Sequence, residues 1–328
     1  MKLTNTTGVS LSVAVWLAHN EYDFKKPTTK TVRRLSVTGL LKPTKAIILG
    51  AQVESSQIDN PDVSQFVHSK IGNSVHTAIE EAWSNENYVD AMLSLGYPIK
   101  VIERIKINPD PDNLEPGCIP VYMEQRSERE INGFTISGKF DFIMDGGLED
   151  FKTTSTFSYT SGSSDEKYVL QGSIYRWLNP KIVTKDHLNI QQIFKDWSAA
   201  KAERDKNYPP SQINQATFKL LTPSEVEKFI IRKTNEIIKY ESLDQAQMPV
   251  CTDEELWRSD SVFKYYANPS ATARSTKNFD TYMEAETFRR SKGKGVIYEV
   301  KGKAKACSYC SAAPMCKQYA EMKEAGLA

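Results

Sequence analysis

The sequence predicts an α/β fold that is followed by a separate, cysteine-containing C-terminal segment. Short runs of strand-forming residues flank the pair Gly146-Gly147, and this pattern predicts a β-hairpin. Amphipathic helices are predicted on both sides of the hairpin, over residues 62–83 and 166–178. Three closely spaced cysteines within Cys307–Cys316 mark the C-terminal segment.

The composition is that of a globular protein, with 328 residues, 40% hydrophobic, 25% charged and a formal net charge of +1. Such a charge gives no global attraction for nucleic acid, so any such binding must come from local patches. Five cysteines in a chain of this length do not suggest a disulfide framework, and we expect a cytoplasmic protein. The apolar stretch Val9–Ala18 is too short to span a bilayer, so no membrane association is expected.

Four segments are expected in chain order: an N-terminal helical and loop segment (1–60), a core (61–200), a helical extension (201–250) and a cysteine-cluster segment (251–328). Within the first segment, residues 36–49 predict one capped helix or two short ones, and residues 22–30 a polar loop.

Helix and strand signals alternate along the core. A second helix is predicted over residues 88–95, and strands are predicted over 101–107, from 121 onward and over 188–197. In the extension, Thr222-Pro223-Ser224-Glu225 is a capping box that opens a helix through about residue 240.

The register of the hairpin decides which side chains share a face. With the two-residue loop Gly146-Gly147, Asp145 pairs with Leu148 and Asp141 lies opposite Lys152. Asp141, Asp150 and Lys152 then point to the same side of the sheet. A three-residue loop would turn Asp141 to the other side.

Two carboxylates and a lysine that converge on one face repel and desolvate one another unless a cation binds there. Their hard oxygen ligands suit Mg²⁺ or Mn²⁺, and Lys152 is placed to orient or deprotonate a water. This arrangement predicts metal-assisted phosphodiester hydrolysis. The same residues also fit a second interpretation, an amphipathic hairpin with surface ion pairs.

Other polar residues are candidates for the same site. His76 follows Gly72 on the predicted helix 62–83, where a glycine in the interior indicates close approach by another element. Glu124 lies in the predicted strand that begins at Val121, and it projects either towards the cluster or into solvent as a surface residue of an edge strand. Gln171 and Tyr175 share one face of the helix 166–178. A lone histidine such as His76 also fits an ordinary core or surface position.

The C-terminal segment carries two further signals. Residues 289–305 hold seven basic residues and one acidic residue, which makes them a candidate for contact with phosphate. Cys307, Cys310 and Cys316 form a C-x2-C-x5-C array that needs a fourth ligand for Zn²⁺ or a [4Fe–4S] cluster. Cys251 and Cys118 are the candidates. We favour Cys251 because it begins the segment that the array ends.

Taken in order, four motifs resemble those of the RecB-like branch of the PD-(D/E)XK nuclease superfamily. They are Gly72-x-x-x-His76, Gly138-x-x-Asp141, Asp150-Phe151-Lys152-Thr153 and Gln171-x-x-x-Tyr175. Together they span about a third of the chain. The flanking segments are similar to phage-encoded exonucleases of this branch.

The resemblance implies a PD-(D/E)XK restriction-endonuclease-like core over residues 61–200, with a mixed central sheet flanked by helices. It implies these site residues: His76, Asp141 and Asp150 as metal ligands together with the Phe151 carbonyl, Lys152 as the catalytic lysine, and Gln171 and Tyr175 holding DNA or the hairpin. Glu124 is added to the candidate catalytic residues from its place in the predicted strand. The tail is similar to the iron–sulfur element of AddB-type and CRISPR-adaptation nucleases. It implies a [4Fe–4S] cluster on Cys251, Cys307, Cys310 and Cys316, with Zn²⁺ as the alternative.

The predicted function is therefore a Mg²⁺- or Mn²⁺-dependent DNA exonuclease of phage recombination, repair or DNA processing. The resemblance implies DNA and a single-strand-annealing recombination protein as partners, and the host cytoplasm as the location. The alternative is a nucleic-acid-binding module with a structural metal site and no catalysis. The set Asp141, Asp150 and Lys152 argues against it, because a protein that only binds has no chemical need for all three.

Overall fold

The computed structural model describes residues 3–19, 32–54, 60–270 and 273–328. The polar loop expected over residues 22–30 lies outside these ranges. Within them, no helix is both long and apolar enough to cross a membrane.

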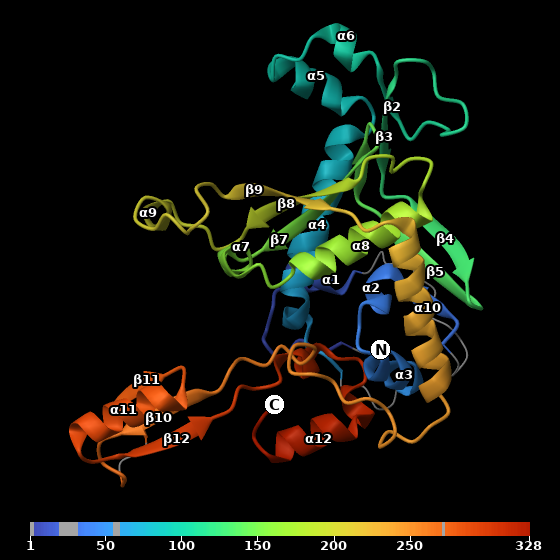
Figure 1. The fold of residues 1–328 in the computed structure, drawn as a ribbon. Coiled ribbons are helices and arrows are strands. Elements are labelled where there is room, and N and C mark those ends of the chain that lie inside the picture. Colours follow the sequence, from blue (N-terminus) through green and yellow to red (C-terminus); the bar gives the residue numbers. More distant parts are fainter. Residues whose placement is uncertain (1–2, 20–31, 55–59, 271–272) are drawn as a thin grey trace. The chain divides into compact units, whose positions relative to one another are not determined.

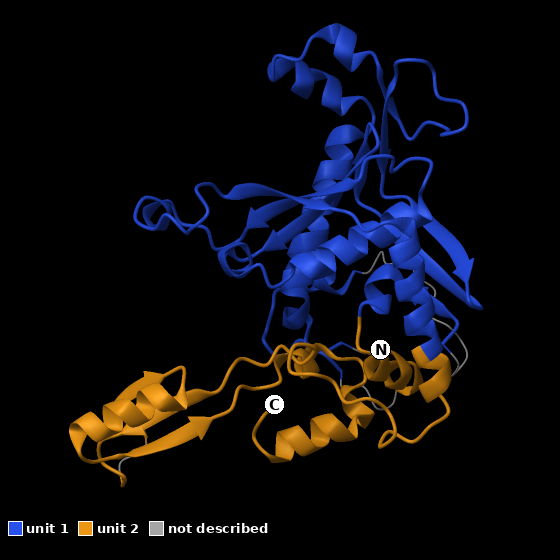
Figure 2. Ribbon diagram, viewed as in Figure 1, with its two compact units in different colours: residues 1–41, 59–235 blue, residues 42–58, 236–328 orange. Residues whose placement is uncertain are grey.

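The chain divides into two compact units (Figure 2). The first comprises residues 1–41 and 59–235, and the second comprises residues 42–58 and 236–328. Each unit therefore contains segments that are far apart in the sequence.

A six-stranded mixed sheet forms the centre of the first unit, in the order β2-β3-β6-β7-β8-β9 (Figure 1). Its strands are β2 (Ile105–Ile107), β3 (Ile119–Met123), β6 (Phe142–Met144), β7 (Gly147–Thr154), β8 (His187–Phe194) and β9 (Ile213–Lys219). The pairs β2/β3 and β7/β8 are parallel, and the other neighbours are antiparallel. A smaller sheet has the order β1-β5-β4, from Arg34–Ser36, Phe134–Lys139 and Arg126–Ile131.

Helices α4 (Val67–Trp83) and α8 (Asp165–Leu178) lie on opposite faces of this sheet. Gly72 of α4 approaches Thr153 of β7, where an added Cβ would lie 3.2 Å from the threonine hydroxyl. Gly172 of α8 instead packs on Leu188, and Gln171 reaches Asp150. Because Thr153 and Asp150 point to opposite sides of β7, the two helices cover different faces. The first unit is thus a mixed α/β structure, and the close approach expected at Gly72 is confirmed.

The remaining helices of the first unit are short or lie at its ends. They are α1 (Leu11–Ala18), α2 (Val37–Leu40), η2 (Val63–Phe66), α5 (Asn87–Ser94), α6 (Ile99–Ile102), α7 (Thr156–Ser161), α9 (Ala199–Ala202) and α10 (Pro223–Tyr240), whose last residues belong to the second unit. Thr222 and Glu225 form the predicted capping box at the start of α10.

The turn of the hairpin β6–β7 lies one residue earlier in the chain than predicted. Met144 pairs with Gly147 and Phe142 with Glu149, so the loop is Asp145-Gly146 and not Gly146-Gly147. Both loop residues have positive φ, 48° and 78°, as a type I′ turn requires. Asp141 therefore falls opposite Asp150 and not Lys152. The Asp141 side chain still points to the same side of the sheet as Asp150 and Lys152. Moving the turn by one residue changes each pairing partner by two residues, which keeps the face.

The strand predicted over residues 101–107 is wrong in its first half. Pro98 precedes the short helix α6, and only Ile105–Ile107 join the sheet as β2. Val101 and Ile105 are four residues apart, a spacing that fits a helical face as well as alternation does.

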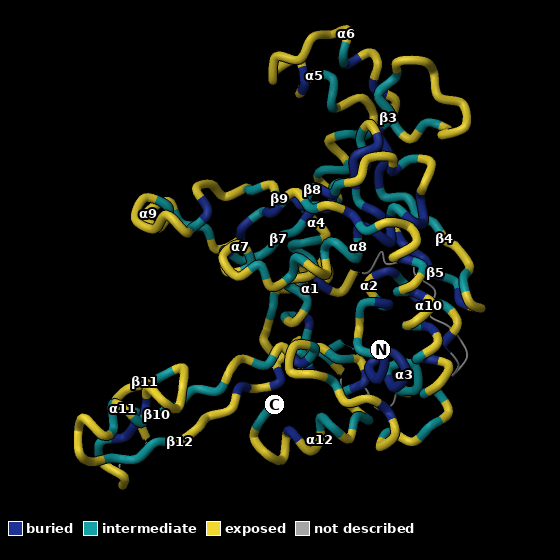
Figure 3. The backbone as a smooth tube through the Cα atoms, viewed as in Figure 1, coloured by how far each residue is buried: buried dark blue, intermediate teal, exposed yellow. Residues whose placement is uncertain are grey.

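The core on the α4 face is built from apolar side chains of β2, β3, β6 and β7 together with α5 and α6. Its buried members are Met92, Ile102, Ile105, Val121, Met123, Phe142 and Phe151. The helix α4 itself has no fully buried residue (Figure 3), although Ile79 and Trp83 pack on this core. One side of α4 is therefore left open to solvent, next to the end of the hairpin.

The second unit contains helices α3 (Thr44–Gln52), α11 (Tyr282–Lys292) and α12 (Lys317–Glu324) and the 3-10 turns η3 (Lys305–Tyr309) and η4 (Ala313–Met315). It also has a three-stranded antiparallel sheet in the order β11-β10-β12, from Lys277–Phe279, Val262–Tyr266 and Val296–Val300. Residues 36–49 thus form two short helices, α2 and α3, as one of the two predictions for this stretch had it.

Candidate metal centre

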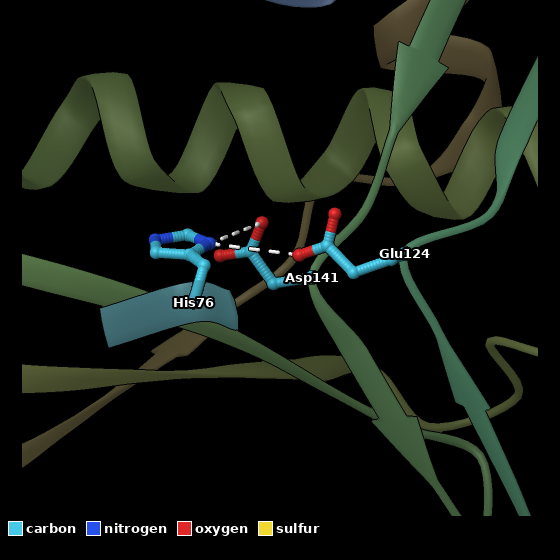
Figure 4. Close-up of side chains that lie close together, drawn as sticks. All are labelled: His76, Glu124 and Asp141. Atoms are coloured by element: carbon cyan, nitrogen blue, oxygen red, sulfur yellow. Dashed lines mark ion pairs between the residues drawn. The ribbon is translucent and has the colours of Figure 1, made fainter. Parts of the chain in front are cut away.

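Three side chains from different elements converge at the end of the hairpin (Figure 4). His76 comes from α4, Glu124 follows β3, and Asp141 precedes β6. The Nδ1 atom of His76 lies 3.5 Å from Asp141 Oδ1 and 3.6 Å from Glu124 Oε1. Among the described residues, this is the group of histidine, cysteine and carboxylate side chains whose donor atoms come within 4.8 Å of one another.

The backbone of Phe151 explains why they meet there. Strand β6 begins at Phe142, which pairs with Glu149. The remainder of β7, from Asp150 to Thr154, therefore has no partner in β6. Phe151 N–H donates instead to Asp141 Oδ2 at 2.9 Å. The Phe151 carbonyl oxygen lies 3.0 Å from His76 Nε2. Asp141 and His76 thus take up the two backbone groups that a longer β6 would have paired.

Glu124 is held at this point by its own backbone. It has φ 51°, and its N–H donates to the Asp141 carbonyl oxygen at 3.1 Å. The Glu124 carboxylate forms an ion pair with Lys139, whose Nζ lies 2.6 Å from Glu124 Oε2. The structure therefore places Glu124 with the cluster and not in solvent.

Asp150 and Lys152 lie on the α8 face of the same strand. Asp150 is only 3% exposed. Its Oδ1 accepts a hydrogen bond from Gln171 Nε2 at 3.1 Å, and its Oδ2 forms an ion pair with Lys152. Gln171 also donates to the Tyr175 hydroxyl at 3.3 Å. The predicted set Asp150, Lys152, Gln171 and Tyr175 is therefore one connected group.

The pKa values of the site are those of a crowded acidic cluster. Burial, followed by the negative charge of Asp141, raises the pKa of Asp150 to about 6. Burial opposes ionisation of His76, but its contacts with Asp141 and Glu124 outweigh this and raise the His76 pKa to about 10. Burial likewise opposes the charge on Lys152, and the charges of Asp150 and Asp141 still raise its pKa. The carboxylates of the site thus favour the protonated forms of His76 and Lys152.

The donor set fits a divalent cation with mixed oxygen and nitrogen ligands. Asp150 Oδ2 is buried and ion-paired with Lys152, and the second lone pair of this carboxylate oxygen is available to a cation beside the lysine. Carboxylate and carbonyl oxygens with one imidazole suit Mn²⁺ or Mg²⁺.

The site opens into a groove of about 520 Å³. Sequence reasoning missed several of its lining residues, among them Lys70, Asn73, Arg126 and Lys139. Lys70, Asn73, Ser74 and Thr77 have the i, i+3, i+4, i+7 spacing of a polar helix face, which was the signal available for α4. Lys139 is separated from Asp141 by one residue, so the motif Gly138-x-x-Asp141 already contained it.

In the second unit, Cys251, Cys307, Cys310 and Cys316 line one cavity of about 30 Å³. All four thiols are free. Burial, followed by the charges of Glu255, Cys316 and Cys310, raises the pKa of Cys251 to about 12. Cys118 belongs to the first unit and lines a different groove. The structure thus brings together the four cysteines of the favoured set.

No protein-family model matches the sequence, and no curated protein matches it. Among solved structures, the chain is similar to the crystal structure of SSO0001, with 14% identity, a TM-score of 0.41, and coverage of 76% of this chain and 98% of that chain. It is also similar to the crystal structure of a phage-related exonuclease from Haemophilus somnus 129PT, with 17% identity, a TM-score of 0.25, and coverage of 37% and 60%. At these TM-scores neither similarity establishes a shared fold.

Proposed function

We propose that the chain is a divalent-metal-dependent DNA nuclease, and specifically an exonuclease, that hydrolyses phosphodiester bonds at the site around Asp141, Asp150 and Lys152. One observation carries the proposal. The side chains of His76, Glu124 and Asp141 meet at the Phe151 carbonyl of β7, beside a groove that also carries Lys70, Arg126 and Lys139. Asp150 and Lys152, which flank Phe151 on β7, form an ion pair.

In this proposal the metal ligands are His76, Asp141, Asp150 and the Phe151 carbonyl, with Glu124 beside them. A bound Mg²⁺ or Mn²⁺ would polarise the scissile phosphate and lower the pKa of a bound water. The protein residues do the rest. Phe151 N–H fixes the Asp141 carboxylate, and Gln171 fixes that of Asp150. Lys152 offsets negative charge on the phosphate and orients the attacking water.

The proposed core is of the RecB-like PD-(D/E)XK type. Its support is the placement of the four motifs: Asp150 on β7 and Asp141 directly before the paired strand β6, His76 on a helix over one face, and Gln171 with Tyr175 on a helix over the other. A role in phage DNA recombination, repair or processing, a single-strand-annealing partner and a cytoplasmic location belong to the same proposal.

A [4Fe–4S] cluster on Cys251, Cys307, Cys310 and Cys316 is also proposed. A single Zn²⁺ with bonds of about 2.3 Å would draw tetrahedral thiolates to about 3.8 Å from one another. Among the described residues, only His76, Glu124 and Asp141 bring three donor atoms within 4.8 Å, so the four thiols are spread more widely than that. They nevertheless line one cavity, and their wider spacing supports a group larger than one zinc ion.

The activity is tested by incubating the full chain with end-labelled linear DNA and with closed circular DNA, each in Mg²⁺, Mn²⁺ or EDTA. An exonuclease degrades the linear DNA in either metal, leaves the closed circle intact, and is inactive in EDTA. Cleavage of the circle would assign an endonuclease instead. DNA binding without hydrolysis in any metal would contradict the proposal and favour the binding module.

A further inference from the structure

Residues 262–300 of the second unit form a small module in which one helix covers one side of a three-stranded sheet. Phe263 and Tyr265 of the central strand β10 point to α11. The ring centroids of Phe263 and Tyr282 are 5.9 Å apart, and those of Tyr265 and Phe288 are 5.1 Å apart. The α11 side is therefore the interior of the module.

The other side of this sheet carries the alternate residues of each strand. Lys264 lies at its centre, paired with Tyr298 of β12 on one side and with Asn278 of β11 on the other. Tyr266 lies diagonal to Tyr298, with ring centroids 5.7 Å apart. Tyr298 is 49% exposed, and Val300 beyond it is also exposed. This surface, which we call the open face, thus combines an exposed aromatic ring with a central lysine.

The segment that contains the open face is basic. Residues 262–305 contain ten lysines and arginines against four acidic residues, a formal charge of +6, which leaves −5 for the rest of the chain. Arg289 and Arg290 on α11 are both ion-paired with Glu286. The charge that a ligand of the open face meets is therefore that of Lys264 at its centre.

We propose that the open face is a binding platform for single-stranded DNA. An exposed ring on a basic sheet surface matches unpaired bases and phosphates together, because bases stack on aromatic rings while lysines track the backbone. Duplex DNA would present phosphates there but no free base surface. This inference rests on the proposed function in taking DNA as the ligand, and it adds a strand-selective site built from residues other than those of the metal centre.

The test is the affinity of the full chain for a labelled oligo(dT) strand and for a duplex of equal length, measured by fluorescence anisotropy in EDTA. Tyr298→Ala is expected to weaken single-strand binding roughly 5- to 100-fold and to leave duplex binding unchanged. Tyr298→Phe should bind like the wild type, because the ring is kept. Tyr282→Ala is the matched control, since Tyr282 is 53% exposed but lies on α11.

The lysine is tested by salt dependence. Lys264→Gln should lower the slope of log K against log salt by about 0.7, the value for one phosphate contact on a single strand. Lys277→Gln is the control, because Lys277 pairs with Tyr265 on the covered side and its Nζ lies 4.9 Å from the Phe288 ring centre. Its slope should not change.

Wild-type affinity of Tyr298→Ala for the single strand, or an equal loss for duplex and single strand, would overturn the platform. The outcome is independent of cleavage, because EDTA removes hydrolysis. If no metal supports hydrolysis but the Tyr298 effect is found, the nuclease proposal fails while the platform stands. If hydrolysis is found and Tyr298 has no effect, the reverse holds.

Discussion

Phe151 contributes its backbone to the site, while its side chain belongs to the core. The ring is 9% exposed and packs with Phe142, whereas the N–H and carbonyl face Asp141 and His76. One residue thus joins the hydrophobic core to the ligand set. Smaller side chains at Phe151 should lower the stability of the fold. The geometry of the ligands should depend instead on the residue at which β6 begins.

Asp150 and its neighbour Glu149 provide a matched pair of carboxylates. Asp150→Asn keeps the shape of the side chain but removes the charge that a metal requires, so cleavage should fall roughly 100- to 1000-fold or more. Glu149 points to the other side of β7 and accepts a hydrogen bond from Gln191, so Glu149→Gln should cleave normally. The measurement is the rate of release of end label in Mn²⁺.

The surroundings of Asp150, Lys152 included, raise its pKa on balance and so favour its neutral form, and Asp150→Asn should therefore unfold at or above the wild-type temperature. Equal cleavage rates for wild type and Asp150→Asn would remove Asp150 from the site.

At the scale of elements, the hairpin shows what the sequence could and could not predict. Alternation around the glycines identified both strands and the shared side of Asp141, Asp150 and Lys152. The turn was misplaced because Asp-Gly and Gly-Gly both tolerate positive φ, and local pattern does not choose between them. The tertiary structure adds a constraint at Gly146, where a Cβ would meet the Thr184 hydroxyl at 2.0 Å.

Gly138 lies where β5, α2 and α8 meet. A Cβ there would lie 2.6 Å from Val37 Cγ2 and 2.9 Å from both Leu178 Cδ1 and Tyr175 Cε1. Gly138→Ala should therefore destabilise the protein by about 1–3 kcal/mol, measured by urea unfolding. Gly147→Ala is the control on the neighbouring hairpin, because its nearest contact, Met144 O, is at 3.4 Å. Equal stability of the two variants would refute close packing at Gly138.

Asp62 joins the start of η2 to the N-terminal residues. Its carboxylate accepts hydrogen bonds from the Thr6 and Thr7 side chains and from Ser64 N–H, and these hold the Asp62 pKa far below its ordinary value of 3.8. A depressed pKa stabilises the fold above the unfolded-state pKa, and this contribution is lost as the pH falls below it.

The stability difference between wild type and Asp62→Ala should therefore be constant from pH 7 to about pH 5 and shrink below about pH 4. Urea unfolding at several pH values measures it. A difference that stays the same down to pH 3 would show that the carboxylate is not held in this way.

At the scale of the whole molecule, the sequence predicted the four cysteines but not the way the chain is divided. Residues 42–58 group with 236–328, and within that unit Thr44 donates a hydrogen bond to Glu236, while Gly50 of α3 approaches Ser311 of the cysteine loop. Contacts across almost 200 or more residues leave no periodic signal. The groove residue Arg126 was missed because it belongs to none of the four motifs, and only the folded chain brings it into the same groove as His76.

The cysteine cluster gives a prediction for the second unit. Anaerobically purified protein should be brown and contain iron and acid-labile sulfide. Cys251→Ser should lose most of the iron, while Cys118→Ser should keep it, because Cys118 does not line the cavity. Iron and sulfide analysis measures both. A colourless protein with stoichiometric zinc, or an iron content unaffected by Cys251→Ser, would contradict the proposed cluster.

The proposed metal centre is tested most directly by anomalous diffraction from crystals grown with Mn²⁺. We predict a manganese peak in contact with the His76 imidazole, the Asp141 and Asp150 carboxylates and the Phe151 carbonyl, at distances of about 2.0–2.3 Å. Crystals of Asp150→Asn grown in the same way should lack the peak. Manganese bound only elsewhere, with the His76 imidazole still on the Phe151 carbonyl at saturating Mn²⁺, would contradict the account.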